Sequence, residues 1–145
     1  MSLNDNLRNL TRSSLHEFME PEALKLLAFS AEALHLKQRD ILFESGKLSD
    51  GGYIIVSGTL ELIEVNGTQT HLPQSGAMIG MTALISETQN GSTARAINDV
   101  EVLKISRPLF LRVLAEFPRS AARMQTILQG KLKNYIDALQ STSLD

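Results

Sequence analysis

The segment of residues 46–62, which reads GKLSDGGYIIVSGTLEL, constrains the fold of this 145-residue chain more than any other. It consists of a glycine-containing loop, an apolar strand, a one-glycine corner at Gly58 and a second strand. A similar corner recurs at residues 76–80, which read GAMIG. Glycine reaches the positive φ angles that let a chain turn sharply. Closely spaced corners between short strands predict a small all-β barrel or jelly roll.

Helical periodicity appears on both sides of this strand-rich region. Apolar residues recur at helical spacing over residues 22–29 after Pro21, over residues 109–114 after the candidate N-cap Ser106, and over residues 119–140. Asn66 and Gly67 predict a tight hairpin turn between two strands. We therefore predict a mainly β fold, an eight-strand jelly roll (double-stranded β-helix) near residues 31–105. One N-terminal helix and two C-terminal helices flank it. The predicted domain covers residues 21–145 and follows a polar N-terminal segment or helix over residues 1–20.

The composition argues against several classes of protein. The net charge of −2 gives no overall attraction to nucleic acid or to anionic membranes, and no stretch approaches the ~20 apolar residues of a membrane span. The chain has no cysteine, and its first residues are too polar for a signal peptide, so we expect a cytoplasmic protein. The scattered His16, His35 and His71 predict no metal site. No nucleophile or phosphate-loop motif is present, and we expect no enzyme.

Several motifs along the chain resemble one known family. Residues 46–62 are similar to the central hairpin of cyclic-nucleotide-binding domains, and residues 37–46 are similar to the strand and loop that precede it. Ile79, Gly80 and residues 94–96 match the borders of the family's phosphate-binding cassette, and residues 100–118 match its last strand and the following helix. The resemblance spans about residues 21–140. It implies the sensor-domain fold of catabolite activator protein-type regulators and of the regulatory subunits of cyclic-AMP-dependent kinase.

The resemblance also implies where a ligand would bind. In the family, a cassette arginine holds the phosphate of a cyclic nucleotide and a glutamate holds its ribose. Asn90 stands at the arginine position here, and Met81 at the glutamate position, whereas Arg95 matches a different, strand-borne arginine. Because each lost charge-assisted bond costs roughly 1.5–3 kcal/mol, we expect cyclic AMP and cyclic GMP to bind only weakly. The candidate ligand-binding residues are Ile79, Gly80, Met81, Thr82, Ala83, Asn90, Gly91, Ser92 and Thr93.

The predicted last helix carries more apolar residues than packing on its own barrel would use. Its heptad seam, at 4-3-4 spacing, consists of Leu128, Leu132, Tyr135 and Leu139. We therefore expect a homodimer through this helix. The resemblance places the base-contacting positions at Tyr135 and Ile136. Activators of the family read DNA with a helix-turn-helix after this helix, and because the sequence ends at Asp145 we expect no DNA-binding module.

Two functions remain open. The first is a regulatory sensor module that recognises a cyclic nucleotide or another small anion in the modified cassette and signals through its C-terminal helix. The second is a degenerate, nucleotide-free domain for dimerisation or protein interaction. The basic residues of the C-terminal part, Arg107 and Arg112 among them, are expected to lie on solvated helix faces.

Overall fold

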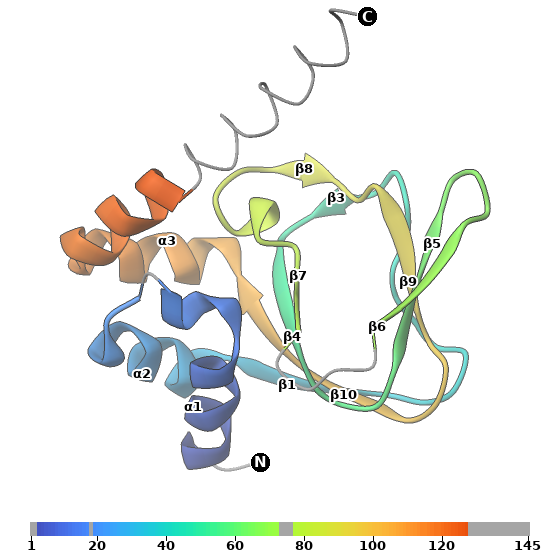
Figure 1. The fold of residues 1–145 in the computed structure, drawn as a ribbon, viewed down its shortest axis with the longest axis horizontal. Helices are drawn as coiled ribbons and strands as arrows, with labels where there is room; N and C mark the ends of the chain where they lie inside the picture. The colour runs from blue at the N-terminus through green and yellow to red at the C-terminus, as the bar shows by residue number, and fades with distance from the viewer. Residues whose placement is uncertain (1–2, 18, 73–76, 128–145) are drawn as a thin grey trace, which may run out of the picture.

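The computed structural model describes residues 3–17, 19–72 and 77–127. The helices gather on one side of a β barrel (Figure 1). In chain order the elements are α1 (Leu3–Arg12), the 3-10 helix η1 (Ser14–Glu17), α2 (Pro21–Ser30), β1 (Glu32–Leu36), β2 (Ile41–Phe43), β3 (Leu48–Ser49), β4 (Gly51–Ser57), β5 (Leu60–Glu64), β6 (Gln69–Leu72), β7 (Met78–Ile79), the 3-10 helix η2 (Thr82–Leu84), β8 (Thr88–Gln89), β9 (Ser92–Ala96), β10 (Val100–Ser106) and α3 (Arg107–Glu116). Residues 118–127 are also helical.

The strands form three antiparallel sheets. One has the order β1-β10-β4-β7, the second has the order β2-β9-β5-β6, and the third pairs β3 with β8. The mainly β fold with flanking helices is confirmed. The predicted number of eight strands is not confirmed, because the described residues contain ten, of which β3, β7 and β8 have two residues each.

Two glycine corners were predicted correctly, for different physical reasons. Gly58 joins β4 to β5 with φ of +84°, and a Cβ atom there would lie 2.3 Å from the Asp99 carbonyl oxygen. Gly67 turns the predicted β5–β6 hairpin with φ of +89°, but a Cβ atom there would meet nothing within 4 Å. Gly58 is therefore required for space as well as for conformation.

Helices α2 and α3 begin where the sequence predicts. Pro21 is the first residue of α2, and Ser106 is the N-cap of α3, where its hydroxyl accepts a hydrogen bond from the Leu109 amide. Strand β10 ends at Ser106 and α3 starts at the next residue, so no loop separates the barrel from this helix.

The core has two parts, because alternate residues of β4 point to opposite faces of its sheet. Ile54 packs with Leu27 and Phe110 in the layer between sheet and helices. Ile55 packs with Leu60 of the facing sheet inside the barrel. The N-terminal segment that the sequence describes as polar also supplies core residues, since the cluster beneath the helices includes fully buried side chains of Leu10 and Leu15.

The predicted seam and base contact lie outside the described residues. They involve Leu128, Leu132, Tyr135, Ile136 and Leu139, and they stay predictions. In the part of the chain that the structure describes, no helix is both long enough and apolar enough to cross a membrane.

Candidate functional site

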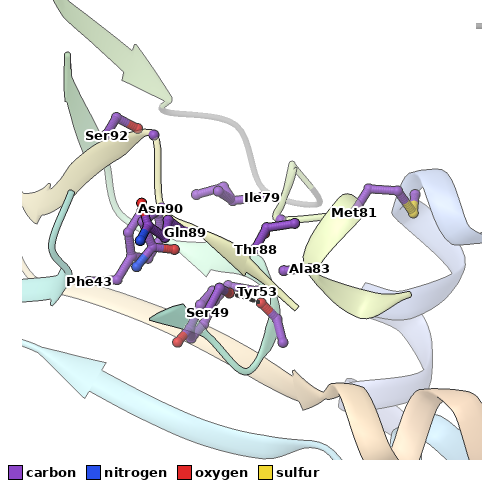
Figure 2. A pocket seen from close by; sticks show the side chains of 13 residues that line it. Phe43, Ser49, Tyr53, Ile79, Met81, Ala83, Thr88, Gln89, Asn90 and Ser92 are labelled. Atoms are coloured by element: carbon purple, nitrogen blue, oxygen red, sulfur yellow. Dashed lines mark hydrogen bonds between the residues drawn. The ribbon is translucent and has the colours of Figure 1, made fainter. Parts of the chain in front are cut away.

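A cavity of about 250 Å³ lies where β7 and η2 face β3 and β8 (Figure 2). Seven of the nine predicted ligand-binding residues line it. Among the described residues, the lining consists of Phe43, Ser49, Gly51, Tyr53, Ile79, Gly80, Met81, Ala83, Thr88, Gln89, Asn90, Gly91 and Ser92. The cassette predicted from the resemblance is therefore a real concavity, formed by two segments that face each other across it.

Thr93 is a predicted residue that does not line the cavity, and Thr82 is the first residue of η2. The Thr93 hydroxyl oxygen accepts a hydrogen bond from the Ser45 amide at 3.1 Å, so this side chain ties β9 to the loop after β2.

About half of the residues that line the cavity were not predicted from the sequence. Phe43 and Tyr53 stack with ring centroids 5.7 Å apart and form its aromatic part. Ser49, Thr88 and Gln89 come from the short β3–β8 sheet. Strands of two residues carry no periodic signal, so nothing in the sequence indicated that these segments pair.

Gly80 fixes the turn between β7 and η2. Its φ is +88°, and a Cβ atom there would lie 3.1 Å from the Gly51 carbonyl oxygen and 3.3 Å from the Gly52 Cα atom. Gly52 is equally enclosed, since its Cβ atom would approach the Ile79 carbonyl oxygen to 3.2 Å. The two backbone segments therefore touch directly, and a side chain at Gly80 would push η2 away from β4.

Met81, at the position of the family's glutamate, works as a packing residue. Although Met81 lines the cavity, its side chain extends toward the helices and away from Asn90 and Gln89 (Figure 2). There it packs against the core cluster beneath the helices, which includes Leu84. The thioether thus anchors the start of η2 to the core.

Asn90, at the position of the family's arginine, closes a loop. Its side-chain amide donates a hydrogen bond to the Glu44 carbonyl oxygen at 3.1 Å. Its backbone N–H donates to the Lys47 carbonyl oxygen, and its own carbonyl oxygen accepts from the Gly46 N–H, both at 2.8 Å. Asn90 therefore holds the loop after β2 against the segment between β8 and β9.

No charged side chain lines the described part of this cavity. One cationic side chain, that of Arg107, lies next to the lining and contacts the backbone of two lining residues. Nη1 of Arg107 donates to the carbonyl oxygens of Ser49 at 3.0 Å, Ala83 at 3.2 Å and Ser86 at 3.3 Å. Nη2 lies 3.9 Å from Glu87.

The expectation that Arg107 lies on a solvated helix face was wrong. Its side chain is only 18% exposed, because the guanidinium is enclosed by backbone carbonyls. Its amide also donates to the Asp50 carbonyl oxygen at 2.7 Å. Arg107 consequently joins β3, η2 and the first turn of α3, and two of the residues that it contacts, Ser49 and Ala83, line the cavity.

A second ionic contact lies beside the aromatic wall. Lys104 is opposite Tyr53 in the β10–β4 pairing, and its ammonium lies 3.0 Å from the Asp50 carboxylate. Burial raises the pKa of Tyr53. Burial acts to lower the pKa of Lys104, but the hydrogen bond to Asp50 and the nearby negative charges outweigh it, so the pKa lies above its usual value. Tyr53 thus remains a neutral phenol at physiological pH.

The described residues contain no group of three or more metal-ligating side chains. The chain contains no cysteine that could serve as a further metal ligand. The site offers aromatic rings, hydroxyls, amides and backbone groups.

Residues 33–117 match the cyclic nucleotide-binding domain family. This match covers more than half of the chain, and the protein belongs to that family. A solved cyclic nucleotide-binding-like protein from Brucella abortus is 40% identical, with a TM-score of 0.66, over 77% of this chain and 98% of that one.

One further solved structure and one further sequence are similar to this chain. The sensor domain of the transcriptional regulator DNR from Pseudomonas aeruginosa has a TM-score of 0.77 at 20% identity, over 93% of each chain, which shows the shared fold. Lysophospholipase NTE1 from Chaetomium globosum is 27% identical over 121 residues. That match covers 81% of this chain but 8% of the much longer lysophospholipase.

Proposed function

We propose that this protein is a regulatory sensor module that binds a small ligand in the cavity beside η2 and transmits the binding event through α3 and the helix that follows it. The observation that carries the proposal is the placement of Arg107. The wall of the cavity and the first turn of α3 share this side chain, so a ligand that displaces η2 also acts on the helix.

The proposed ligand is a cyclic nucleotide or another small anion, held mainly by neutral groups. The lining contains a stacked aromatic pair, suited to a planar ring, and the amides and hydroxyls of Gln89, Ser49 and Ser92. Two charge-assisted bonds are missing, at Met81 and Asn90. Their loss weakens binding by roughly two to four orders of magnitude relative to an intact cassette. The proposal includes no catalytic step.

A second function, a nucleotide-free interaction domain, is supported by a different observation. Met81 and Asn90 both have structural tasks, as a core anchor and as a loop tie. If the protein is such an interaction domain, the homodimer proposed through the heptad seam is the functional unit, and the cavity has no ligand.

Calorimetry and NMR with cyclic AMP and cyclic GMP distinguish the two functions. For the sensor, we expect saturable binding weaker than micromolar, with amide shifts at Gly80, Ala83 and Gly91 and further shifts in α3. Binding with sub-micromolar affinity would contradict the neutral-cassette reasoning. If neither nucleotide shifts these amides at millimolar concentration, the interaction domain is the better description.

Gly80→Ala and Gly91→Ala form a matched pair for this test. Both glycines line the cavity, but only Gly80 has a positive φ and close backbone neighbours, whereas a Cβ atom at Gly91 meets nothing within 4 Å. We expect Gly80→Ala to abolish binding and Gly91→Ala to preserve it. Equal binding by the two variants would show that the ligand binds elsewhere.

A further inference from the structure

The outer face of the sheet β2-β9-β5-β6 lies on the opposite side of the molecule from the helices (Figure 1). It contains a groove of about 440 Å³. The groove, here called the Arg39–Arg95 groove, is lined by Gln38, Arg39, Ile41, Glu61, His71, Arg95, Ala96 and Ile97. No described residue lines both this groove and the cavity beside η2.

Strand register places one row of side chains across all four strands. Ile41 is opposite Arg95, Arg95 is opposite Glu61, and Glu61 is opposite His71. Residues opposite each other in paired strands project from the same face of a sheet. The row therefore combines one apolar, one acidic and two basic side chains on a single surface.

Glu61 holds Arg95 in a fixed orientation. The Glu61 side chain is only 8% exposed, and its Oε2 atom accepts hydrogen bonds from Nη2 of Arg95 at 2.9 Å and from Nε at 3.3 Å. Nε2 of His71 lies 3.9 Å from the other carboxylate oxygen. Within the described residues, Nη1 of Arg95 has no hydrogen-bond partner. A guanidinium fixed in this way loses little further freedom when it binds an anion.

Arg39 adds a second cation from a strained backbone position. Its φ is +79°, and it is the only non-glycine residue with positive φ in the described chain. This left-handed conformation is unfavourable for an L-residue. It is maintained by hydrogen bonds of 2.8 Å from the Arg39 amide to the Ala96 carbonyl oxygen and from the Ala96 amide to the Asp40 carbonyl oxygen. The Arg39 side chain is exposed, and no described residue binds it.

We propose that the Arg39–Arg95 groove binds an acidic peptide segment of a protein partner. The Glu61 charge is already paired with Arg95, so the groove keeps a cationic excess at Arg39 that is complementary to carboxylates. Ile41 is 50% exposed, and together with the neighbouring Ile97 it offers apolar surface. A peptide covers both kinds of surface, whereas a free anion would leave the apolar part in water.

The test is an NMR titration of the labelled protein at low salt. The probe is the acetylated, amidated tetrapeptide Leu-Asp-Glu-Leu, and the control peptide is the neutral Leu-Asn-Gln-Leu. We expect the acidic peptide to shift the amides of Arg39, Arg95 and Ile97 and to leave Gly80 and Asn90 unchanged. The affinity should fall as salt is added, because exposed charges are screened.

Arg39→Gly is the decisive variant, since glycine keeps the positive φ while the cation is removed. We expect roughly three- to fivefold weaker peptide binding, because Arg39 is exposed and solvent screens its ion pairs. Lys25→Ala removes an exposed charge from α2 as a control, and we expect a change of less than twofold. Equal binding of the neutral peptide, or full binding by Arg39→Gly, would overturn the proposal. So would the absence of shifts at millimolar peptide, or inorganic phosphate binding the same residues as tightly as the peptide.

Discussion

Replacing Arg107 by methionine tests the contact that joins the cavity to α3. Methionine keeps most of the length and the apolar stem but removes every donor of the guanidinium. The change leaves the carbonyl oxygens of Ser49, Ala83 and Ser86 without this donor. The amide of residue 107 would keep its hydrogen bond to the Asp50 carbonyl oxygen.

The expected cost follows from the geometry. Nη1 has two hydrogens for three carbonyl oxygens, so we count two full hydrogen bonds rather than three. Each bond from a charged donor contributes about 1.5–3 kcal/mol. Because the Arg107 side chain is 18% exposed, we take the lower end of that range, about 3 kcal/mol in total. Against a stability of about 5–15 kcal/mol, the variant should still fold.

Urea unfolding followed by circular dichroism measures this loss, and the melting temperature should fall by roughly 10 °C. Arg112→Met is the matched control, because Arg112 is exposed on the same helix, and we expect it to change stability by less than about 0.5 kcal/mol. Hydrogen exchange should also show faster exchange at the Leu84 and Asn90 amides in Arg107→Met alone. Equal stability of the two variants would refute the reasoning, because it would mean that the carbonyl contacts contribute nothing.

Three further predictions concern the corners, the cassette and the assembly. Gly58→Ala should unfold at a urea concentration well below that of Gly67→Ala, because both carry a positive φ but only Gly58 has a carbonyl oxygen 2.3 Å from the new Cβ atom; similar midpoints would contradict this. Met81→Glu combined with Asn90→Arg should bind cyclic AMP at least tenfold more tightly in calorimetry and lose stability, since an anchor and a loop tie are replaced; unchanged affinity would show that charge is not what this cassette lacks. Leu132→Asp should turn a dimer into a folded monomer by light scattering, and an unmodified protein that is monomeric at tens of micromolar would remove the seam.

Local signals in the sequence were sufficient for the barrel. Gly58 and Gly67 mark corners through backbone conformation, and Ser106 marks a helix start through its side chain, so each acts on its immediate neighbours. The number of strands was not predictable in the same way, because two-residue strands depend on pairing between distant segments.

The candidate site was harder to predict, because tertiary contacts decide what its residues do. The resemblance located the cavity at Gly80 and Asn90, but it could not show that Asn90 binds the Glu44 carbonyl oxygen. Arg107 looks like any surface arginine in the sequence, since its partners are backbone carbonyls that lie 21 to 58 positions away. The positive φ of Arg39 likewise has no signal in the neighbouring sequence, because glycine is the residue that ordinarily occupies such a turn.

The direct junction of β10 and α3 gives the helix the properties of a lever arm. With no loop between Ser106 and Arg107, a tilt of α3 relative to the barrel must occur at this joint. Ten residues of helix span about 15 Å, so a tilt of about 10° would displace the far end by roughly 2.6 Å. Arg107 lies at the fulcrum, where movements are smallest. A sub-ångström change at the cavity wall would therefore be amplified along the helix before it reached Phe117.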